Sequence, residues 1–396
     1  MPSNKSTTGL NTMGKVSLLW SPVLSGYTSI GILPVLPQIQ AHYSDVPNSA
    51  TIVRLLITII GVAMVFGAPI AGFCANRFGW RRMLLGGSIA YGLIGVAGAF
   101  VDSLWLLLLT RLLLGLATAV VGTLMMTIAT TAMAGDERNK WLGYVMVAGM
   151  VSSLILIPLS GILGSVSWRV PFLVYGMGFV MAVLVAVGVP DQETDTSDTS
   201  GLEGAGPETR AGFPFIIIGV ALTTGILCGA QSVYLPFHIA NLGVRDPTTV
   251  SLSMLPGAAI GALFSMLYGR IRRKLSIPAT FMLAFAAAGM GQSVIGTAGG
   301  VTGVIIGGII SGMGIGLMTP NLYAFTAVIG TTAERARNMG LTRGGFFAGP
   351  LLAQAALEPI AAIAKAGGAI LALGALGIVS ALVFSRLKSE KVAIET

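Results

Sequence analysis

The sequence predicts an all-α membrane protein with twelve transmembrane helices in two pseudo-repeated six-helix bundles. Three observations support this fold class. The chain is 54% hydrophobic and only 10% charged, whereas a soluble domain carries roughly 25% charged residues. It divides into twelve apolar runs, each close to the length of about 20 residues that spans a bilayer. Its basic residues are also distributed unequally between the turns that join these runs.

The apolar runs fall into two groups of six. In the first half they cover residues 16–40, 52–75, 83–101, 104–131, 142–164 and 169–189. In the second half they cover residues 213–237, 248–269, 276–296, 301–328, 340–362 and 367–385. The uncharged stretch from Leu275 to Ala333 is too long for one helix, so we place a turn at Gly296–Gly300.

A polar segment separates the two halves. Residues 190–212 are rich in Asp, Glu, Ser, Thr and Gly and show no apolar periodicity, which is typical of a solvated linker. We therefore expect an N-terminal six-helix bundle over residues 1–189, a cytoplasmic linker over 190–212 and a C-terminal six-helix bundle over 213–396.

The basic residues predict the orientation of the chain. If the turn at Arg77–Arg82 is cytoplasmic, 18 of the 23 Lys and Arg residues lie on that side. The other five are Arg54, Arg111, Arg169, Arg245 and Lys365. Because basic loops favour the cytoplasmic face, we expect both termini to be cytoplasmic in a multi-pass protein of the bacterial inner, or plasma, membrane. The net charge of +8 thus reflects topology and does not indicate nucleic-acid binding.

The two halves also repeat a short pattern. Residues 137–143 and 334–340 both read E-R-x-[KR]-x-x-G, about half the chain apart, and each follows the fourth run of its half. The basic turn at Arg77–Arg82 has a shorter echo at Gly269–Arg273, after the second run of the second half. Duplicated six-helix halves place a site at their interface in many transporters.

The turn after the second run carries a family signature. It fits the pattern G-x-x-x-D-R-x-G-R-[RK] with one extra residue, Trp80, and with Asn76 at the acidic position; the matching residues are Gly72, Arg77, Gly79, Arg81 and Arg82. The turn resembles the signature of the major facilitator superfamily. The resemblance extends over the whole chain and implies the major facilitator fold, with alternating access to a central site.

The resemblance also implies a conformational latch at this turn. In the family, the acid and the arginine of the turn bind neighbouring helix ends in the outward-facing state. Here Arg77 can meet Asp136 or Glu137, whereas Asn76 brings no charge to a helix dipole, so we expect a weaker latch. The candidate latch residues are Gly72, Asn76, Arg77, Gly79, Arg81, Asp136 and Glu137.

Arg111 lies in the fourth run, in the sequence Arg111-Leu-Leu-Leu-Gly115. This resembles the R-x-x-x-G motif of antiporters in the superfamily. A cation about 12 Å along a helix is costly unless it faces protein or a water-filled cavity. We therefore expect Arg111 to bind substrate or to influence a proton site; the alternative is an arginine that snorkels to the outer surface.

Two runs resemble the G-x-x-x-G-P-x-x-G-G motif of proton-coupled drug exporters. The fifth run matches it in part, over Pro158–Gly164, with Ser153 and Ile157 where glycines are expected. The eleventh run matches it more fully, over Gly345–Ala353. Glycine and proline there allow close packing and bending of helices, so packing and coupling both explain this pattern.

Acidic residues within the runs are almost absent. Glu358, near the outer end of the eleventh run, is the plausible buried carboxylate. We consider it a proton-coupling candidate; alternatively, it pairs with Lys365 at the membrane surface.

The candidate substrate-binding residues come from the runs that line the cavity in the family, together with the eleventh. They are Tyr27, Thr28, Arg111, Gln231, Tyr234, Asn321, Tyr323 and Gln354. Each polar residue could instead form an interhelical hydrogen bond. The GxxxG spacings within residues 303–316 favour helix packing.

The sequence shows no enzyme motif, no metal-ligand spacing and no P-loop, so we expect no catalytic residues, no metal and no cofactor. We expect a monomeric secondary transporter that exports small amphipathic or drug-like compounds in exchange for protons. One alternative is a transporter of small organic anions or metabolites with Arg111 as the anion partner. Another is a membrane receptor or scaffold that does not transport.

Overall fold

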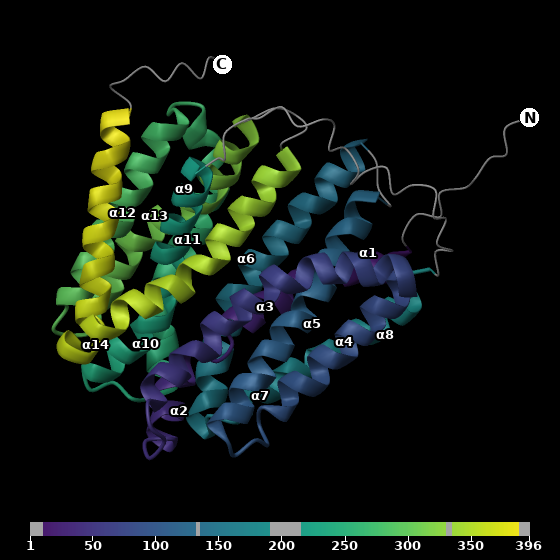
Figure 1. Cartoon of the computed structure of the whole chain (residues 1–396), viewed down its shortest axis with the longest axis horizontal. Coiled ribbons are helices and arrows are strands. Elements are labelled where there is room, and N and C mark those ends of the chain that lie inside the picture. The colour runs from purple at the N-terminus through teal and green to yellow at the C-terminus, as the bar shows by residue number, and fades with distance from the viewer. Residues whose placement is uncertain (1–10, 132–134, 191–214, 330–334, 388–396) are drawn as a thin grey trace, which may run out of the picture. The chain divides into compact units, whose positions relative to one another are not determined.

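The computed structural model describes residues 11–131, 135–190, 215–329 and 335–387. The regular structure in these ranges is helical (Figure 1). The chain forms two compact units. Unit 1 comprises Met1–Ile32 and Ile59–Thr199, and unit 2 comprises Leu33–Thr58 and Ser200–Thr396. The expected bundle boundaries, which follow chain order, remain a prediction, and residues 191–212 of the expected linker lie outside the described ranges.

Unit 1 is built from long apolar helices that pack around α4 and α1. Helix α4 packs against α5 and α8, and α1 packs against α6 and α8. Helix α3 begins in unit 2 and continues into unit 1 after Thr58. The elements are α1 (Thr12–Ile30), α3 (Ser49–Phe78), α4 (Trp80–Ala97), α5 (Leu104–Thr131), α6 (Gly135–Val166), α7 (Val170–Leu173), η2 (Val174–Gly176) and α8 (Met177–Gly188).

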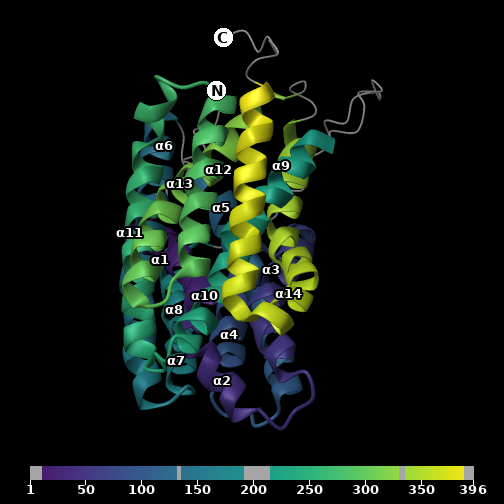
Figure 2. The same ribbon diagram turned by 90° about the vertical axis from the view of Figure 1, so that its left-hand side faces the viewer.

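Unit 2 contains a layer in which α11, α12, α13 and the second part of α14 lie side by side (Figures 1 and 2). Helix α14 also packs against α9, η4 and α10. The elements are η1 (Leu33–Val35), α2 (Leu36–His42), α9 (Phe215–Gly225), the π-helix η4 (Ile226–Ala230), α10 (Gln231–Asn241), α11 (Pro247–Arg272), α12 (Ile277–Thr297), α13 (Val301–Val328) and α14 (Arg335–Leu387).

The helices confirm the predicted membrane fold. Within the described ranges, 10 helical segments are long and apolar enough to cross a membrane. Helix α4 is shorter, with 18 residues, and begins with the basic pair Arg81-Arg82. Helix α14 covers two predicted spans. They meet at Lys365, where the backbone is not helical (φ 58° and ψ −171°). With α4 included and α14 divided at Lys365, each of the twelve predicted runs has a helical counterpart. The chain is a multi-pass membrane protein.

Close contacts between glycines hold α11 against α13. A Cβ atom on Gly312 would overlap the carbonyl oxygen of Gly257, and a Cβ on Gly316 would overlap that of Gly261. The Ser265 hydroxyl also donates to the Gly316 carbonyl at 2.6 Å. In lipid, small residues allow such backbone approach and so stabilise helix pairs. The predicted packing role of the GxxxG spacings is therefore confirmed at these positions.

Two helix starts show how the turns are built. Gly79 caps α4 with φ 88°, a left-handed conformation that strongly favours glycine. At the start of α11, the Asp246 carboxylate accepts from the backbone N–H of Thr249 at 2.9 Å and from its hydroxyl at 2.7 Å. These donors lower the pKa of Asp246, because they favour the charged form.

Candidate functional site

Glu358 forms an ion pair with Arg54 inside unit 2. The Nη1 atom of Arg54 donates to Oε1 of Glu358 at 2.7 Å and to Oε2 at 2.6 Å. The Thr51 hydroxyl donates to Oε1 at 2.7 Å. The side chain of Arg54 is 11% exposed and that of Glu358 is 28% exposed. Charge-assisted hydrogen bonds of this kind are strong, so Arg54 and Thr51 fix the position of the Glu358 side chain. Glu358 pairs here with Arg54 and not with Lys365, which is exposed.

Two aromatic rings of α10 cover the guanidinium of Arg54. Its Cζ atom lies 5.4 Å from the ring centroid of Tyr234 and 5.4 Å from that of Phe237. Both aromatic side chains are buried. A cation over an aromatic face is attracted by the ring quadrupole. The two rings and the Glu358 carboxylate therefore both stabilise the charge of Arg54.

Gln354 supports this cluster one helical turn before Glu358. Its side-chain amide donates to the Thr51 carbonyl at 3.0 Å and accepts from the Thr58 hydroxyl at 2.9 Å. These bonds fix α14 against α3 beside the ion pair. We call Thr51, Arg54, Tyr234, Phe237, Gln354 and Glu358 the Arg54 cluster. It brings together three residues that the sequence analysis selected: Tyr234, Gln354 and Glu358.

Gln231 lies at the end of the π-helix η4 and joins three helices. Its side-chain oxygen accepts from the amide of Gln292 at 2.9 Å and from the hydroxyl of Ser311 at 2.6 Å. The Gln292 amide also donates to the carbonyl of Leu227 within η4 at 2.9 Å. A π-helix disturbs the regular backbone ladder and often marks a functional position. Here Gln292 satisfies a carbonyl of η4.

The glycine–proline pattern of the eleventh run packs against this π-helix. A Cβ atom on Gly229 would overlap the ring of Pro350. A Cβ on Gly349 would lie 2.6 Å from the backbone nitrogen of Ile226. The pattern thus permits close contact of α14 with η4, as the packing interpretation predicts.

The two candidates of α13 differ in their surroundings. Asn321 is fully buried; its amide donates to the Ile277 carbonyl at 3.1 Å and its oxygen accepts from the Tyr268 hydroxyl at 3.1 Å. Tyr323 is partly exposed. Asn321 therefore serves as an interhelical hydrogen-bonding residue in this structure.

Arg111 is fully buried inside unit 1. Its Cζ atom lies 4.8 Å from the ring centroid of Phe172 and 4.9 Å from that of Tyr175. Its Nη2 atom donates to the Gly95 carbonyl at 3.4 Å, and Nε lies 3.4 Å from the Thr110 hydroxyl. Full burial is not compatible with an arginine that snorkels to the surface. Within the described residues Arg111 forms no ion pair, and its Nη1 atom has no hydrogen-bond partner.

Tyr27 and Thr28 of α1 lie close to the aromatic side chains around Arg111. The Tyr27 hydroxyl donates to the Pro171 carbonyl at 2.7 Å, and its ring centroid lies 4.9 Å from that of Tyr175. The hydroxyl of Thr28 lies 3.1 Å from that of Thr118 and 3.2 Å from that of Tyr91. Both residues are buried and bonded within unit 1 in this structure.

The candidate latch shows other pairings in this structure. Glu137 accepts from Lys15 at 2.9 Å, and Arg81 donates to the Ala186 carbonyl at 2.7 Å. The guanidinium of Arg77 lies over its neighbour Phe78 at 5.8 Å. Gly72 faces open space. The side chains of Asn76 and Asp136 lie outside the described set, so their latch role stays a prediction.

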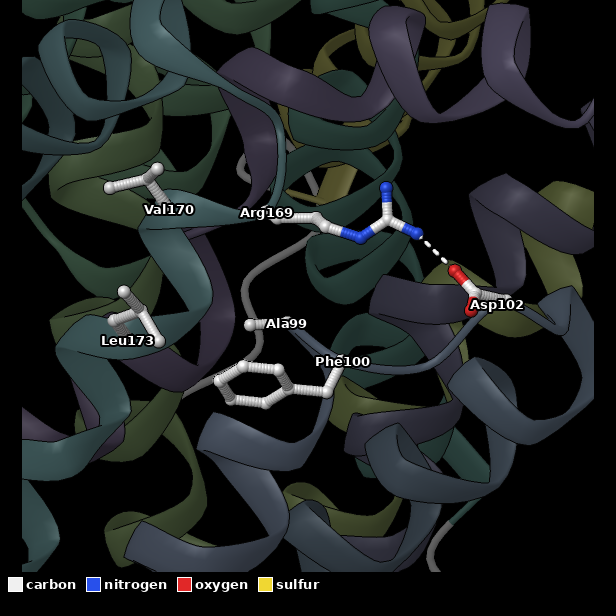
Figure 3. Close-up of a pocket in the computed structure, with 6 residues that line it drawn as sticks. All are labelled: Ala99, Phe100, Asp102, Arg169, Val170 and Leu173. Carbon is white, nitrogen blue, oxygen red and sulfur yellow. Dashed lines mark hydrogen bonds and ion pairs between the residues drawn. The ribbon is translucent and has the colours of Figure 1, made fainter.

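An open pocket of about 410 Å³ lies between the end of α4 and the start of α7. Arg169 and Asp102 form an ion pair at its edge, and Phe100, Val170 and Leu173 supply apolar walls (Figure 3). None of the sequence-predicted site residues lines this pocket.

Solved structures of transporters share the fold. The chain matches the crystal structure of a D-xylose–proton symporter with a TM-score of 0.77 and 14% identity, over 93% of this chain and 96% of that one. It matches the crystal structure of a mutant of the nucleoside transporter NupG with a TM-score of 0.76 and 12% identity, over 95% and 98%. At this level of identity the likeness concerns the fold.

Drug resistance proteins are similar in sequence. The chain is 27% identical over 213 residues to the tetracycline resistance protein, class B, of Escherichia coli, covering 53% of this chain and 51% of that protein. It is 26% identical over 348 residues to the class D protein of Salmonella ordonez, covering 81% and 84%. It is 23% identical over 244 residues to the quinolone resistance protein NorA of Staphylococcus aureus (strain MSSA476), covering 60% and 62%. The match thus spans about half the length of the class B protein.

A family model covers most of the sequence. The model described as Major Facilitator Superfamily matches residues 18–353, and the fold and the turn at Gly79 agree with it. The chain therefore belongs to the Major Facilitator Superfamily, which is a family of secondary transporters and not of enzymes.

Proposed function

We propose that this protein exports small amphipathic or drug-like compounds in exchange for protons, with Glu358 as the proton carrier. One observation carries this proposal. Among the candidate spans that the structure describes, Glu358 is the only Asp or Glu. An ionisable residue at membrane depth is costly and commonly serves a transport pathway.

The surroundings of Glu358 suit a carboxylate that exchanges its partner. Its oxygens accept hydrogen bonds from Arg54 and Thr51, and its side chain is 28% exposed. A proton on Glu358 would remove its attraction for Arg54 and so weaken the contact of α3 with α14 at this point, while the hydrogen bonds of Gln354 remain. Proton uptake is thereby linked to a local structural change. The similarity to tetracycline and quinolone resistance proteins supports the export of drug-like compounds.

No specific observation favours the alternative of organic anion transport. That alternative relied on Arg111 as an anion partner. All the described contacts of Arg111 are made to residues of unit 1, and its side chain has no exposed surface.

Export has a direction, so the proposal includes the orientation of the chain in the membrane. Both termini and the turn at Gly79 face the cytoplasm in a plasma, or bacterial inner, membrane. The basic asymmetry of the sequence supports this orientation. The turn at Arg77–Arg82 then acts as the cytoplasmic latch.

Ethidium transport in everted membrane vesicles tests the proposed function. An imposed pH gradient, acidic inside, should drive ethidium uptake in the wild type. The variant Glu358→Gln should lose the gradient-driven component, whereas Asp45→Asn should keep it, because Asp45 is exposed in a turn before α3. Equal ethidium uptake with and without the gradient in the wild type would contradict proton coupling.

A further inference from the structure

The guanidinium of Arg54 is held in the way that a protein holds a bound organic cation. One side is bonded to both oxygens of a carboxylate, at 2.7 and 2.6 Å. Two aromatic rings lie at 5.4 Å from its central carbon. A carboxylate together with aromatic faces is the usual recognition chemistry for guanidinium and quaternary ammonium groups. The ring-bearing helix α10 and the carboxylate-bearing helix α14 both lie in unit 2, as does Arg54.

A second observation shows that the cluster has unused binding capacity. The hydroxyl of Tyr234 has no hydrogen-bond partner in the described structure, although its side chain is fully buried. The Nε atom of Arg54 is also buried and without a partner. A buried polar group without a partner is destabilising, because it has lost its hydrogen bonds to water. With Arg54 in place, the Tyr234 hydroxyl and the Nε atom of Arg54 therefore remain without hydrogen-bond partners.

The ion pair is not the only bond between α3 and α14 at this point. Thr51 bonds independently to Glu358, and Gln354 bonds to the Thr51 carbonyl and to Thr58. None of these bonds involves the guanidinium, so they would remain if a ligand displaced it. The partial exposure of Arg54 and Glu358 gives a ligand access to the carboxylate.

We propose that Glu358, Tyr234 and Phe237 form a binding site for planar organic monocations, such as guanidinium or amidinium compounds, and that Arg54 is its internal occupant. A ligand takes the place of Arg54 on the carboxylate and between the rings, and an N–H of the ligand donates to the Tyr234 hydroxyl. The proposal rests on the proposed function and adds the chemical class of substrate. It also assigns Arg54 as a competitor that weakens cation binding.

Phenylguanidinium and its neutral isostere phenylurea test this site. Their binding is measured by calorimetry on the purified protein in lipid nanodiscs. The variant Arg54→Gln removes the internal cation and keeps a polar side chain, so phenylguanidinium should bind at least tenfold more tightly than to the wild type. Phenylurea should gain nothing. Glu358→Gln should abolish phenylguanidinium binding, alone or combined with Arg54→Gln.

A matched control and a milder variant complete the design. Arg169→Gln removes another paired arginine, that of the Asp102 ion pair in unit 1, and should leave binding unchanged. Arg54→Lys keeps the charge but loses the planar fork, so its affinity should lie between those of the wild type and Arg54→Gln. If Arg54→Gln does not elute as a folded protein in gel filtration, the Arg54→Lys variant is used in its place. Phenylguanidinium binding to Arg54→Lys that is no tighter than to the wild type would then refute the proposal.

The proposal is wrong if removal of the arginine leaves phenylguanidinium affinity equal or lower, or if phenylurea gains as much as phenylguanidinium. These outcomes are separate from the fate of the proposed function. Gradient-driven ethidium transport with unchanged phenylguanidinium binding in Arg54→Gln would refute the cation site alone. Tighter binding without any effect of a pH gradient on transport would refute proton coupling alone.

Discussion

Arg54 and Glu358 are 304 positions apart in the chain, yet they form an ion pair that joins α3 to α14. This pair places a basic residue against the single carboxylate of the described spans. It is surrounded by Thr51, Tyr234 and Phe237, so that hydrogen bonding and aromatic contact act on the same two charges. A carboxylate whose paired cation is partly accessible can exchange that cation for another, which is the basis of the proposed cation site.

The first prediction concerns the hydrogen bonds at the π-helix. Gln292→Leu removes the donor that satisfies the Leu227 carbonyl and the Gln231 side chain. Gln231 keeps its bond from Ser311, but the Leu227 carbonyl loses the Gln292 donor, and a buried acceptor left unsatisfied costs about 1–3 kcal/mol, so the melting temperature in detergent should fall by several degrees. The control Thr297→Val lies on the exposed end of the same helix and should change it little. A melting temperature equal to that of the wild type in Gln292→Leu would show that η4 does not need this bond.

These hydrogen bonds also illustrate how much the sequence could predict. Apolar run lengths and basic turns are sufficient for the twelve helices, because the bilayer sets the length of each span. The sequence places Gln231 among the cavity residues, whereas the structure shows it bonded to Gln292 and Ser311. Gln292 and Ser311 lie on α12 and α13. The sequence of an apolar helix does not show which of its faces packs against another helix, so these bonds to Gln231 could not be predicted.

Arg54 shows the same limit for the candidate site. From its position near the start of its run, the sequence places it among the five basic residues on the outer side, with no further role. The signal available was a charged residue within an otherwise uncharged span. Its pairing with Glu358 requires the packing of α3 against α14, which no local pattern records.

The second prediction concerns Arg111. Arg111→Met keeps much of the side-chain length between Phe172 and Tyr175 but removes the charge and the bond to the Gly95 carbonyl. We expect this variant to fold with a melting temperature near that of the wild type, but to transport ethidium at less than about a tenth of its rate, because a charge buried within a span commonly serves transport. That loss corresponds to at least about 1.4 kcal/mol of transition-state stabilisation. Arg111→Lys should recover transport in part, because it restores charge without the planar fork. Transport at the wild-type rate by Arg111→Met would make Arg111 a packing residue.

The third prediction concerns the latch. Asn76→Asp adds a negative charge at the acidic position of the family signature, where it can interact with a helix N-terminus. We expect a shift toward the outward-facing state, measured as distance distributions between spin labels on the cytoplasmic helix ends. Asn76→Ser, which adds no charge, is the control. Distributions that are identical in the wild type and Asn76→Asp would contradict the latch.

The fourth prediction concerns orientation. Single cysteines introduced within residues 190–212 should be unreactive toward an impermeant thiol reagent added to intact cells, because the linker is expected to be cytoplasmic. The same cysteines should react after the cells are permeabilised. A cysteine introduced in place of the exposed Asp45 is the positive control for labelling from outside. Labelling of the linker in intact cells would reverse the proposed topology.

In the proposed transport cycle, Glu358 carries the proton that is exchanged for substrate. Its most direct test is proton movement in proteoliposomes that contain a pH-sensitive dye and are electrically clamped with valinomycin and potassium. An imposed ethidium gradient should drive protons in the opposite direction in the wild type, and Glu358→Gln should show no ethidium-dependent change of internal pH. Ethidium movement without a pH change in the wild type, or the same pH change in Glu358→Gln, would contradict the account.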